Sequence, residues 1–178
     1  MLKRDQAVLA VIDIQGKLAS LIHDKQSCYD NIVRMIQAAE VLGIDVICTE
    51  QCPEKLGTTI PEISEHLNVT PISKVAFSCC GQDEFVEALK RTGRSQVILA
   101  GIETHICVYQ TARDLQNSGY EVFVLIDAVS SRTEANRKLG LERMQQAGAT
   151  LTSVEMALFE MLGAAEGDQF KKIARIVK

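Results

Sequence analysis

The segment from Gln96 to Ala112, QVILAGIETHICVYQTA, is the most informative stretch of this chain for its fold. Its apolar, β-branched start predicts a buried strand that ends at Gly101. A helical pattern then begins near Thr104 and places Cys107 in the first turn, where free N–H groups and the helix dipole favour the thiolate over the thiol. Parallel α/β folds place their sites where strands end and helices begin. The segment therefore indicates Cys107 as a candidate nucleophile at the junction of a strand and a helix. The more ordinary role for a cysteine is that of a small buried hydrophobic residue.

The same alternation of strand and helix signals runs along the whole chain. Strands are expected at residues 7–14, 44–49, 69–73, 96–100, 121–127 and 150–153. Helices are expected at residues 28–42, 83–92, 104–118, 133–147, 154–162 and 168–177. Continuous apolar strands between amphipathic helices predict a parallel sheet that is covered on both faces. We therefore predict one doubly wound α/β domain spanning residues 1–178.

Composition excludes several classes of function. The 178 residues are 47% hydrophobic and 24% charged, with a formal net charge of −4, which gives no basic surface for nucleic acid. No run approaches the roughly 18 apolar residues that cross a bilayer, so no membrane partner is expected. The first apolar run is interrupted by Asp13, which argues against a signal peptide. We expect a cytoplasmic protein acting on a small molecule.

The cysteines and glycines lack the spacings of common cofactor sites. The chain has six cysteines, but without a secretory signal disulfides are not expected. The pairs Cys48–Cys52 and Cys79–Cys80 have no second pair at zinc-site spacing. No Gly-x-Gly-x-x-Gly or Walker A sequence occurs, and Gly16 alone is weak support for phosphate binding. The sequence therefore predicts no cofactor.

Three predicted strand ends carry an acid, a cation and a thiol to one edge of the sheet. Asp13 closes the first strand, Lys74 follows the third, and Cys107 opens the helix after the fourth. In such a set the carboxylate takes the thiol proton, the ammonium stabilises the thiolate, and the thiolate forms a covalent intermediate. The alternatives are ordinary ones: Asp13 caps a loop, and Lys74 is a solvated surface charge.

Five motifs together resemble those of the isochorismatase-like cysteine hydrolases. In chain order they are VIDIQ, TEQ-x-P-x-x-LG-x-T, SK-x-x-FS, G-I-E-T-x-x-C-V-x-x-TA and DA-x-SSR, and they span nearly the whole chain. The TEQ loop is similar to the branch of the isochorismatase domain-containing proteins. The resemblance implies a Rossmann-like three-layer αβα sandwich with a central parallel six-stranded sheet. It also implies Asp13 as proton acceptor and donor, Lys74 as electrostatic partner, and Cys107 as nucleophile.

The resemblance carries two further expectations. It implies a cis peptide between Ile102 and Glu103, which would aim the Glu103 N–H beside that of Cys107 and form an oxyanion hole. It also implies a homo-oligomer, either a dimer or a larger ring. Neither expectation follows from composition or spacing.

Residues near the strand ends are candidates for the substrate pocket. We assign Gln15, Gln51, Phe77 and Ile102 to substrate binding, although loop solvation suits the two glutamines equally and a core position suits Phe77. Arg132 is interpreted as a helix cap or a subunit contact. Specificity is expected in the loops at residues 16–24, 51–59 and 78–82.

Two departures from the family pattern define the expected chemistry. Nicotinamidase members of this family carry an Asp-x-His metal element, but here that region reads CTEQCPEKLGTT, and His23, His66 and His105 are isolated in sequence. We therefore predict no catalytic metal. Retention of Cys107 favours cleavage of a C–N bond in a small amide or ureide-like substrate through an acyl-enzyme. The alternatives are an isochorismatase-type ether hydrolase that uses Asp13, and a non-catalytic oligomeric binding protein.

Overall fold

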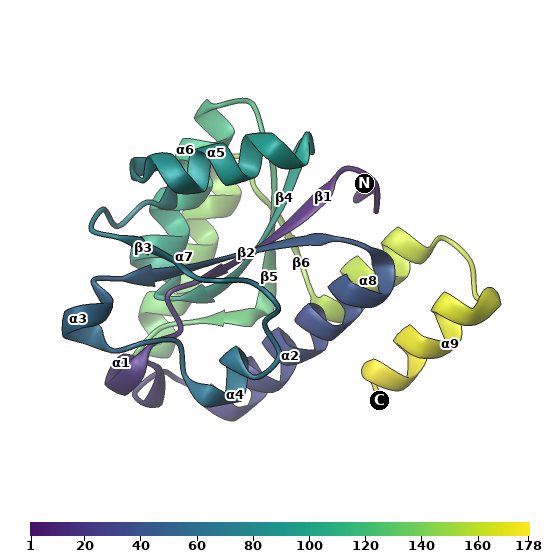
Figure 1. Cartoon of the computed structure of the whole chain (residues 1–178), viewed down its shortest axis with the longest axis horizontal. Coiled ribbons are helices and arrows are strands. Elements are labelled where there is room, and N and C mark those ends of the chain that lie inside the picture. The colour runs from purple at the N-terminus through teal and green to yellow at the C-terminus, as the bar shows by residue number, and fades with distance from the viewer.

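The computed structural model describes residues 1–178 and is built around a six-stranded sheet in which every neighbouring pair of strands is parallel (Figure 1). The strands are β1 (Ala7–Ile12), β2 (Asp45–Gln51), β3 (Ile72–Lys74), β4 (Gln96–Ile102), β5 (Glu121–Ser130) and β6 (Thr150–Thr152). Their order across the sheet is β3-β2-β1-β4-β5-β6. The expected parallel sheet is confirmed.

Helices cover both faces of this sheet. One face is covered by α2, α8 and α9, and the other by α5, α6 and α7, which gives three layers. The helical segments are α1 (Gly16–Ser20), α2 (Lys25–Leu42), α3 (Pro53–Leu56), α4 (Pro61–Ser64), η1 (Cys79–Gly81), α5 (Asp83–Thr92), η2 (Thr104–Val108), α6 (Tyr109–Asn117), α7 (Glu134–Gln146), α8 (Val154–Leu162) and α9 (Gly167–Ile176). None of the helices combines the length and the apolar character needed to cross a membrane.

The central strands are apolar throughout because each contributes to two cores. Successive side chains of a strand point to opposite faces. In β1, Leu9 and Val11 therefore pack under α2, whereas Val8 and Ala10 pack under the helices of the other layer. All six residues of β1 are buried. This double burial explains why the sequence shows continuous apolar runs rather than alternation.

The direction of the chain connections reverses between β1 and β4. From β1 the chain proceeds outward to β2 and β3, whereas from β4 it proceeds outward to β5 and β6. Such a point leaves a crevice at the carboxyl ends of the two central strands. The strands approach closely there, since a Cβ on Gly101 (φ +132°) would lie 2.1 Å from the Ile12 carbonyl oxygen. Only glycine fits this position without displacing β1.

Several predicted boundaries are wrong, and the structure gives the reasons. The first strand ends at Ile12 rather than at residue 14, and β3 includes Lys74 as its last residue. The predicted strand at 121–127 extends to Ser130 because a register shift between Leu99 and Gly101 restores pairing further along β5. The helix predicted at 104–118 begins with the π-helical turn η2. The short helices α1, α3 and α4 were not expected, because four or five residues show no helical period.

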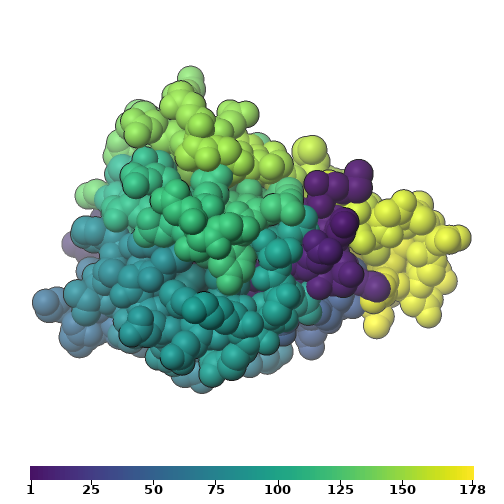
Figure 2. Space-filling view, turned by 90° about the horizontal axis from the view of Figure 1, so that it is seen from above, coloured from purple at the N-terminus to yellow at the C-terminus, as the bar shows by residue number.

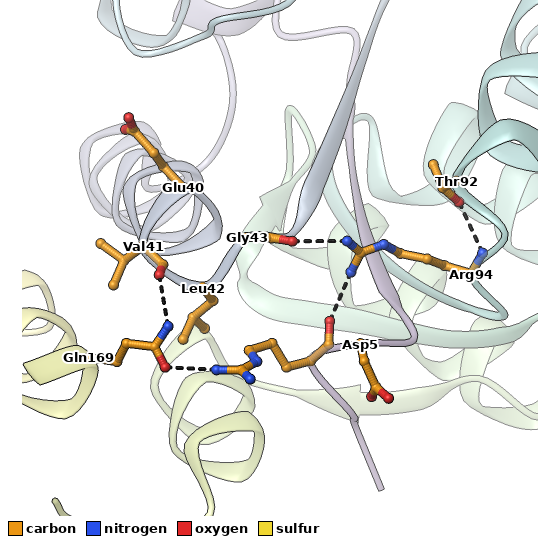
Figure 3. A pocket seen from close by; sticks show the side chains of 9 residues that line it. Asp5, Glu40, Val41, Leu42, Gly43, Thr92, Arg94 and Gln169 are labelled. Carbon is orange, nitrogen blue, oxygen red and sulfur yellow. Dashed lines mark hydrogen bonds between the residues drawn. The ribbon is translucent and has the colours of Figure 1, made fainter. Parts of the chain in front are cut away.

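At the end of the sheet opposite the crevice, Arg94 links several segments of the chain by hydrogen bonds and an ion pair (Figure 3). Its guanidinium donates to the carbonyl oxygens of Arg4, Ala7 and Gly43, each at 2.9 Å, and forms an ion pair with Asp45. Figure 2 shows the N-terminal residues beside α9 at one end of the molecule, where Gln169 accepts a hydrogen bond from Arg4. This cluster joins both termini to the core and lies away from the crevice.

Candidate active site

Asp13 lies directly after β1, at the crevice, with a left-handed backbone (φ +53°) and a buried side chain. Both carboxylate oxygens accept hydrogen bonds. Oδ1 accepts from the Thr49 hydroxyl at 2.8 Å, and Oδ2 accepts from Lys74 Nζ at 2.6 Å. A residue held in a rarely populated backbone region by fixed partners is common at functional sites. The carboxylate therefore has a fixed orientation.

Lys74 is 1% exposed, so the alternative of a solvated surface charge is wrong. Its ammonium donates to Asp13 Oδ2 at 2.6 Å, Gln51 Oε1 at 2.8 Å, and the carbonyl oxygens of Ala76 and Phe77 at 3.1 Å. A buried ammonium is tolerated only when it is paired and its protons are satisfied. Lys74 therefore neutralises and orients the Asp13 carboxylate, and it also anchors the loop that follows β3.

Cys107 lies in η2, the turn that connects β4 to α6, and is 7% exposed. The turn packs tightly against α7, because a Cβ on Gly140 would lie 2.8 Å from Thr104 C and 2.9 Å from His105 Cα. A glycine on α7 thus lets the two segments touch through their backbones. This contact fixes the segment that carries the thiol.

The expectation that the helix start makes Cys107 a thiolate is wrong for the resting protein. Burial raises the pKa of the Cys107 thiol, and the charge of Asp13 and a hydrogen bond with it raise that pKa further. The Lys74 ammonium lowers it, but by less than burial and the Asp13 charge raise it. Burial also raises the pKa of the neighbouring Cys79, to about 11. Burial and the neighbouring carboxylate therefore favour the thiol form of Cys107, and both side chains line the same cavity.

A cavity of about 260 Å³ opens beside the thiol at the carboxyl ends of β1 and β4. It is lined by Asp13, Gln15, Leu18, Gln51, Leu56, Phe77, Ile102, Glu103, Ile106, Cys107 and Arg132. Every predicted site residue lines this cavity except Lys74, which forms an ion pair with Asp13. Sequence reasoning missed Leu18 and Leu56, which lie on the unpredicted helices α1 and α3, and placed Arg132 outside the site.

The side-chain amides of the two glutamines that line the cavity form hydrogen bonds within the chain. Gln15 donates to the carbonyl oxygens of Gln51 (3.1 Å) and Gly57 (2.6 Å), and its oxygen accepts from the Gln51 N–H at 2.6 Å. The Gln51 side chain donates to Val75 O and accepts from Lys74. These bonds tie together the loops that form the cavity wall, so neither glutamine is a freely solvated loop residue.

Glu103 is buried at the rim of the cavity and holds Arg132. Its carboxylate accepts from Arg132 Nε at 2.6 Å and Nη2 at 3.3 Å, and His105 Nε2 lies 3.6 Å away. The Ile102–Glu103 peptide is cis, as the family resemblance implies. The Glu103 N–H donates no hydrogen bond within the chain. That N–H therefore belongs to a residue that lines the cavity and has no acceptor within the chain.

The cavity has no metal-binding set. No group of three or more His, Cys, Asp or Glu side chains is placed to hold a metal ion anywhere in the chain. The two carboxylates that line the cavity are instead paired with cations. Asp13 pairs with the Lys74 ammonium, and Glu103 pairs with the Arg132 guanidinium.

The three layers and the crevice at the switch point of the sheet place the chain in the α/β class. More particularly, the chain belongs to the isochorismatase family, because the family model for the isochorismatase domain matches residues 7–156. Isochorismatase domain-containing protein 2A of Mus musculus is 37% identical over 179 residues, which cover 98% of this chain and 84% of the relative.

Solved structures agree with this assignment. The MAR1 ribonuclease of Caenorhabditis elegans has a TM-score of 0.93 and 37% identity, covering 99% of this chain and 91% of that one. YcaC of Escherichia coli, described as an octameric hydrolase of unknown specificity, has a TM-score of 0.91 and 26% identity over 98% of this chain and 89% of its own. YcaC of Pseudomonas aeruginosa matches equally well, at 26% identity over 98% of this chain and 90% of its own, and was solved with covalent acrylamide.

Proposed function

We propose that the protein is a cysteine hydrolase that cleaves the C–N bond of a small amide or ureide-like substrate through an acyl-enzyme on Cys107. The observation that carries this proposal is the buried Asp13–Lys74 pair, 2.6 Å apart, whose carboxylate faces the same cavity as the thiol. A base beside a nucleophile, itself oriented by a third group, is the usual arrangement for covalent catalysis.

In the first step Asp13 accepts the proton of the Cys107 thiol. The sulfur then forms a bond to the substrate carbonyl carbon, and the carbonyl electron pair moves to the oxygen. When this tetrahedral species collapses, the C–N bond breaks and Asp13 returns its proton to the leaving nitrogen. Lys74 keeps the carboxylate in place and balances its charge during both transfers.

In the second step water hydrolyses the thioester. Asp13 accepts a proton from water, the hydroxide oxygen bonds to the acyl carbon, and the C–S bond breaks. Cys107 recovers its proton from Asp13, and a carboxylic acid leaves. The products are this acid and ammonia or an amine, so atoms and charge balance without a cofactor.

The proposed oxyanion hole consists of the N–H groups of Glu103 and Cys107. Its support is that the Glu103 N–H has no acceptor within the chain and that Glu103 and Cys107 both line the cavity. Donors fixed in advance stabilise developing charge without reorganisation, and losing one donor costs about 10²–10³ in kcat. Ile102 and Phe77 would contact the apolar part of the substrate, while Gln15 and Gln51 shape the walls.

The relatives support parts of this proposal. The covalent acrylamide of P. aeruginosa YcaC is consistent with a reactive nucleophile in that relative, since nucleophiles add to the alkene carbon of acrylamide, but it does not bear on amide cleavage. The octameric E. coli relative supports a homo-oligomer here. The name ribonuclease is not carried over, because a single cation, Arg132, lines the cavity and the formal net charge of −4 gives no basic surface for RNA. A cytoplasmic location stays a prediction.

The test is a panel of small amides incubated with the wild type, Cys107→Ala and the matched thiol control Cys80→Ala. We expect turnover by the wild type and by Cys80→Ala, none by Cys107→Ala, and an acyl adduct on Cys107 by intact mass. Equal turnover by Cys107→Ala would remove the nucleophile. Isochorismate cleavage that survives Cys107→Ala but not Asp13→Asn would establish the ether hydrolase instead.

A further inference from the structure

The hydrogen bonds of the cavity leave one side chain with unused donors. The carboxylate of Asp13 is bonded through both oxygens, and the amides of Gln15 and Gln51 are bonded through both oxygen and nitrogen. The remaining lining residues are mostly apolar. Arg132 differs, since its Nη1 donates no hydrogen bond within the chain and its side chain is 53% exposed.

The guanidinium of Arg132 is held in one orientation. Glu103 accepts from its Nε and Nη2, and also from the Arg132 backbone N–H at 3.2 Å. Glu103 in turn is only 4% exposed, so the anchor is itself fixed by burial. A guanidinium fastened along one edge presents its other edge as a planar pair of donors that match oxygen acceptors. Little side-chain entropy is then lost when a ligand binds.

We infer that Arg132 binds an oxygen acceptor at the end of the substrate remote from the scissile amide. This inference rests on the proposed function. The substrate class is then a short acyl amide with three parts: the amide carbonyl at Cys107, an apolar stem against Leu18, Leu56 and Ile106, and a terminal carbonyl or carboxylate at Arg132. At about 30 Å³ for each water-sized group, the cavity of about 260 Å³ holds roughly eight or nine heavy atoms.

Three probes of eight heavy atoms each separate the possibilities. Succinamide carries a second carbonyl, succinamate carries a carboxylate, and 4-methylpentanamide replaces the remote group by an isopropyl group of the same shape. Since Glu103 already balances the charge of Arg132, either oxygen source satisfies the inference. Comparing succinamide with succinamate then identifies which of them is preferred.

The experiment measures kcat/KM for the three amides with the wild type, Arg132→Met and Arg132→Lys. We expect the wild type to prefer at least one oxygen-bearing amide over 4-methylpentanamide by about tenfold or more. Arg132→Met should remove this preference by lowering kcat/KM for the oxygen-bearing amides more than for 4-methylpentanamide. Arg132→Lys should restore part of this preference, since the lysine ammonium keeps the positive charge but lacks the planar pair of donors of a guanidinium.

A merely structural role for Arg132 would lower all three rates by the same factor, and that result would overturn the inference. Failure of the proposed function is separated by calorimetry on Cys107→Ala, which needs no turnover. There, succinamide or succinamate should bind at least tenfold more tightly than 4-methylpentanamide, and the additional change Arg132→Met should abolish the difference. Equal binding of all three probes to Cys107→Ala would also overturn the inference, whatever reaction the enzyme performs.

Discussion

Replacing Asp13 by Asn should change the chemical reactivity of Cys107 and the enzymatic activity in opposite directions. The Asp13 carboxylate raises the pKa of the Cys107 thiol by its charge and its hydrogen bond, so its removal lowers that pKa. Two unit charges about 4 Å apart interact by roughly 4 kcal/mol at an effective dielectric constant near 20. The Lys74 ammonium is present in both proteins and lowers the pKa of the thiol in each, so it does not cancel this change. We therefore expect the pKa to fall by at least about one unit.

The assay is the rate of iodoacetamide alkylation of Cys107 between pH 6 and 11, located by peptide mass. Below its pKa a thiol gains about tenfold in thiolate per pH unit. The wild-type rate should therefore keep rising beyond pH 9, because the pKa lies above the usual thiol value of 9.0. Asp13→Asn should shift this curve at least about one unit to lower pH, which makes alkylation at least about tenfold faster at pH 8, while amide turnover falls by about 10²–10⁴.

The matched control is Asp5→Asn, which removes the same charge at the opposite edge of the sheet and should leave both rates unchanged. Slower or unchanged alkylation in Asp13→Asn would refute the reasoning, because it would mean that the carboxylate does not hold the proton on the sulfur. Because unfolding would also expose Cys107 and speed its alkylation, the urea unfolding midpoint of Asp13→Asn is measured beside the two rates, and faster alkylation supports the reasoning only in a folded variant.

Three further substitutions test the supports of the site. Lys74→Met should cost about 3–5 kcal/mol in the free energy of urea unfolding, because it leaves the buried Asp13 carboxylate without its ion-pair partner. Gly140→Ala should cost about 1–3 kcal/mol and lower kcat, since the new Cβ would displace η2, whereas the exposed Gln145→Ala on the same helix should do neither. Thr49→Val should lower kcat about tenfold by freeing Asp13 Oδ1, and Thr49→Ser should restore it; equal kcat in both variants would exclude the positioning role.

The layers of the fold could be predicted because the signals are local and periodic. The apolar runs of β1 and β4 and the glycines after α2 and α5 mark strands and helix ends directly. The short helix α3 could not be found in this way, although it carries Leu56 into the cavity. Four residues that begin with a proline show no helical period, and the residue that follows them is held by a tertiary contact, the hydrogen bond that Gln15 donates to the Gly57 carbonyl oxygen.

The candidate site was predictable in its members but not in its electrostatics. Asp13 and Cys107 follow adjacent strands, and this placement can be derived from the alternation of elements. The protonation state of Cys107 could not, because burial and the Asp13 carboxylate outweigh the helix start. Arg132 was misplaced for a related reason: its partner Glu103 is 29 residues away in sequence, and nothing local indicates a buried carboxylate.

The reversal of chain direction between β1 and β4 has a consequence for the protein during its synthesis. The acid and its lysine belong to the half of the sheet made first, and the thiol belongs to the half made later. Neither half holds all three residues of the proposed site. Asp13 and Cys107 come together only when β4 docks beside β1. The pairing of these two strands is therefore the event that assembles the proposed site.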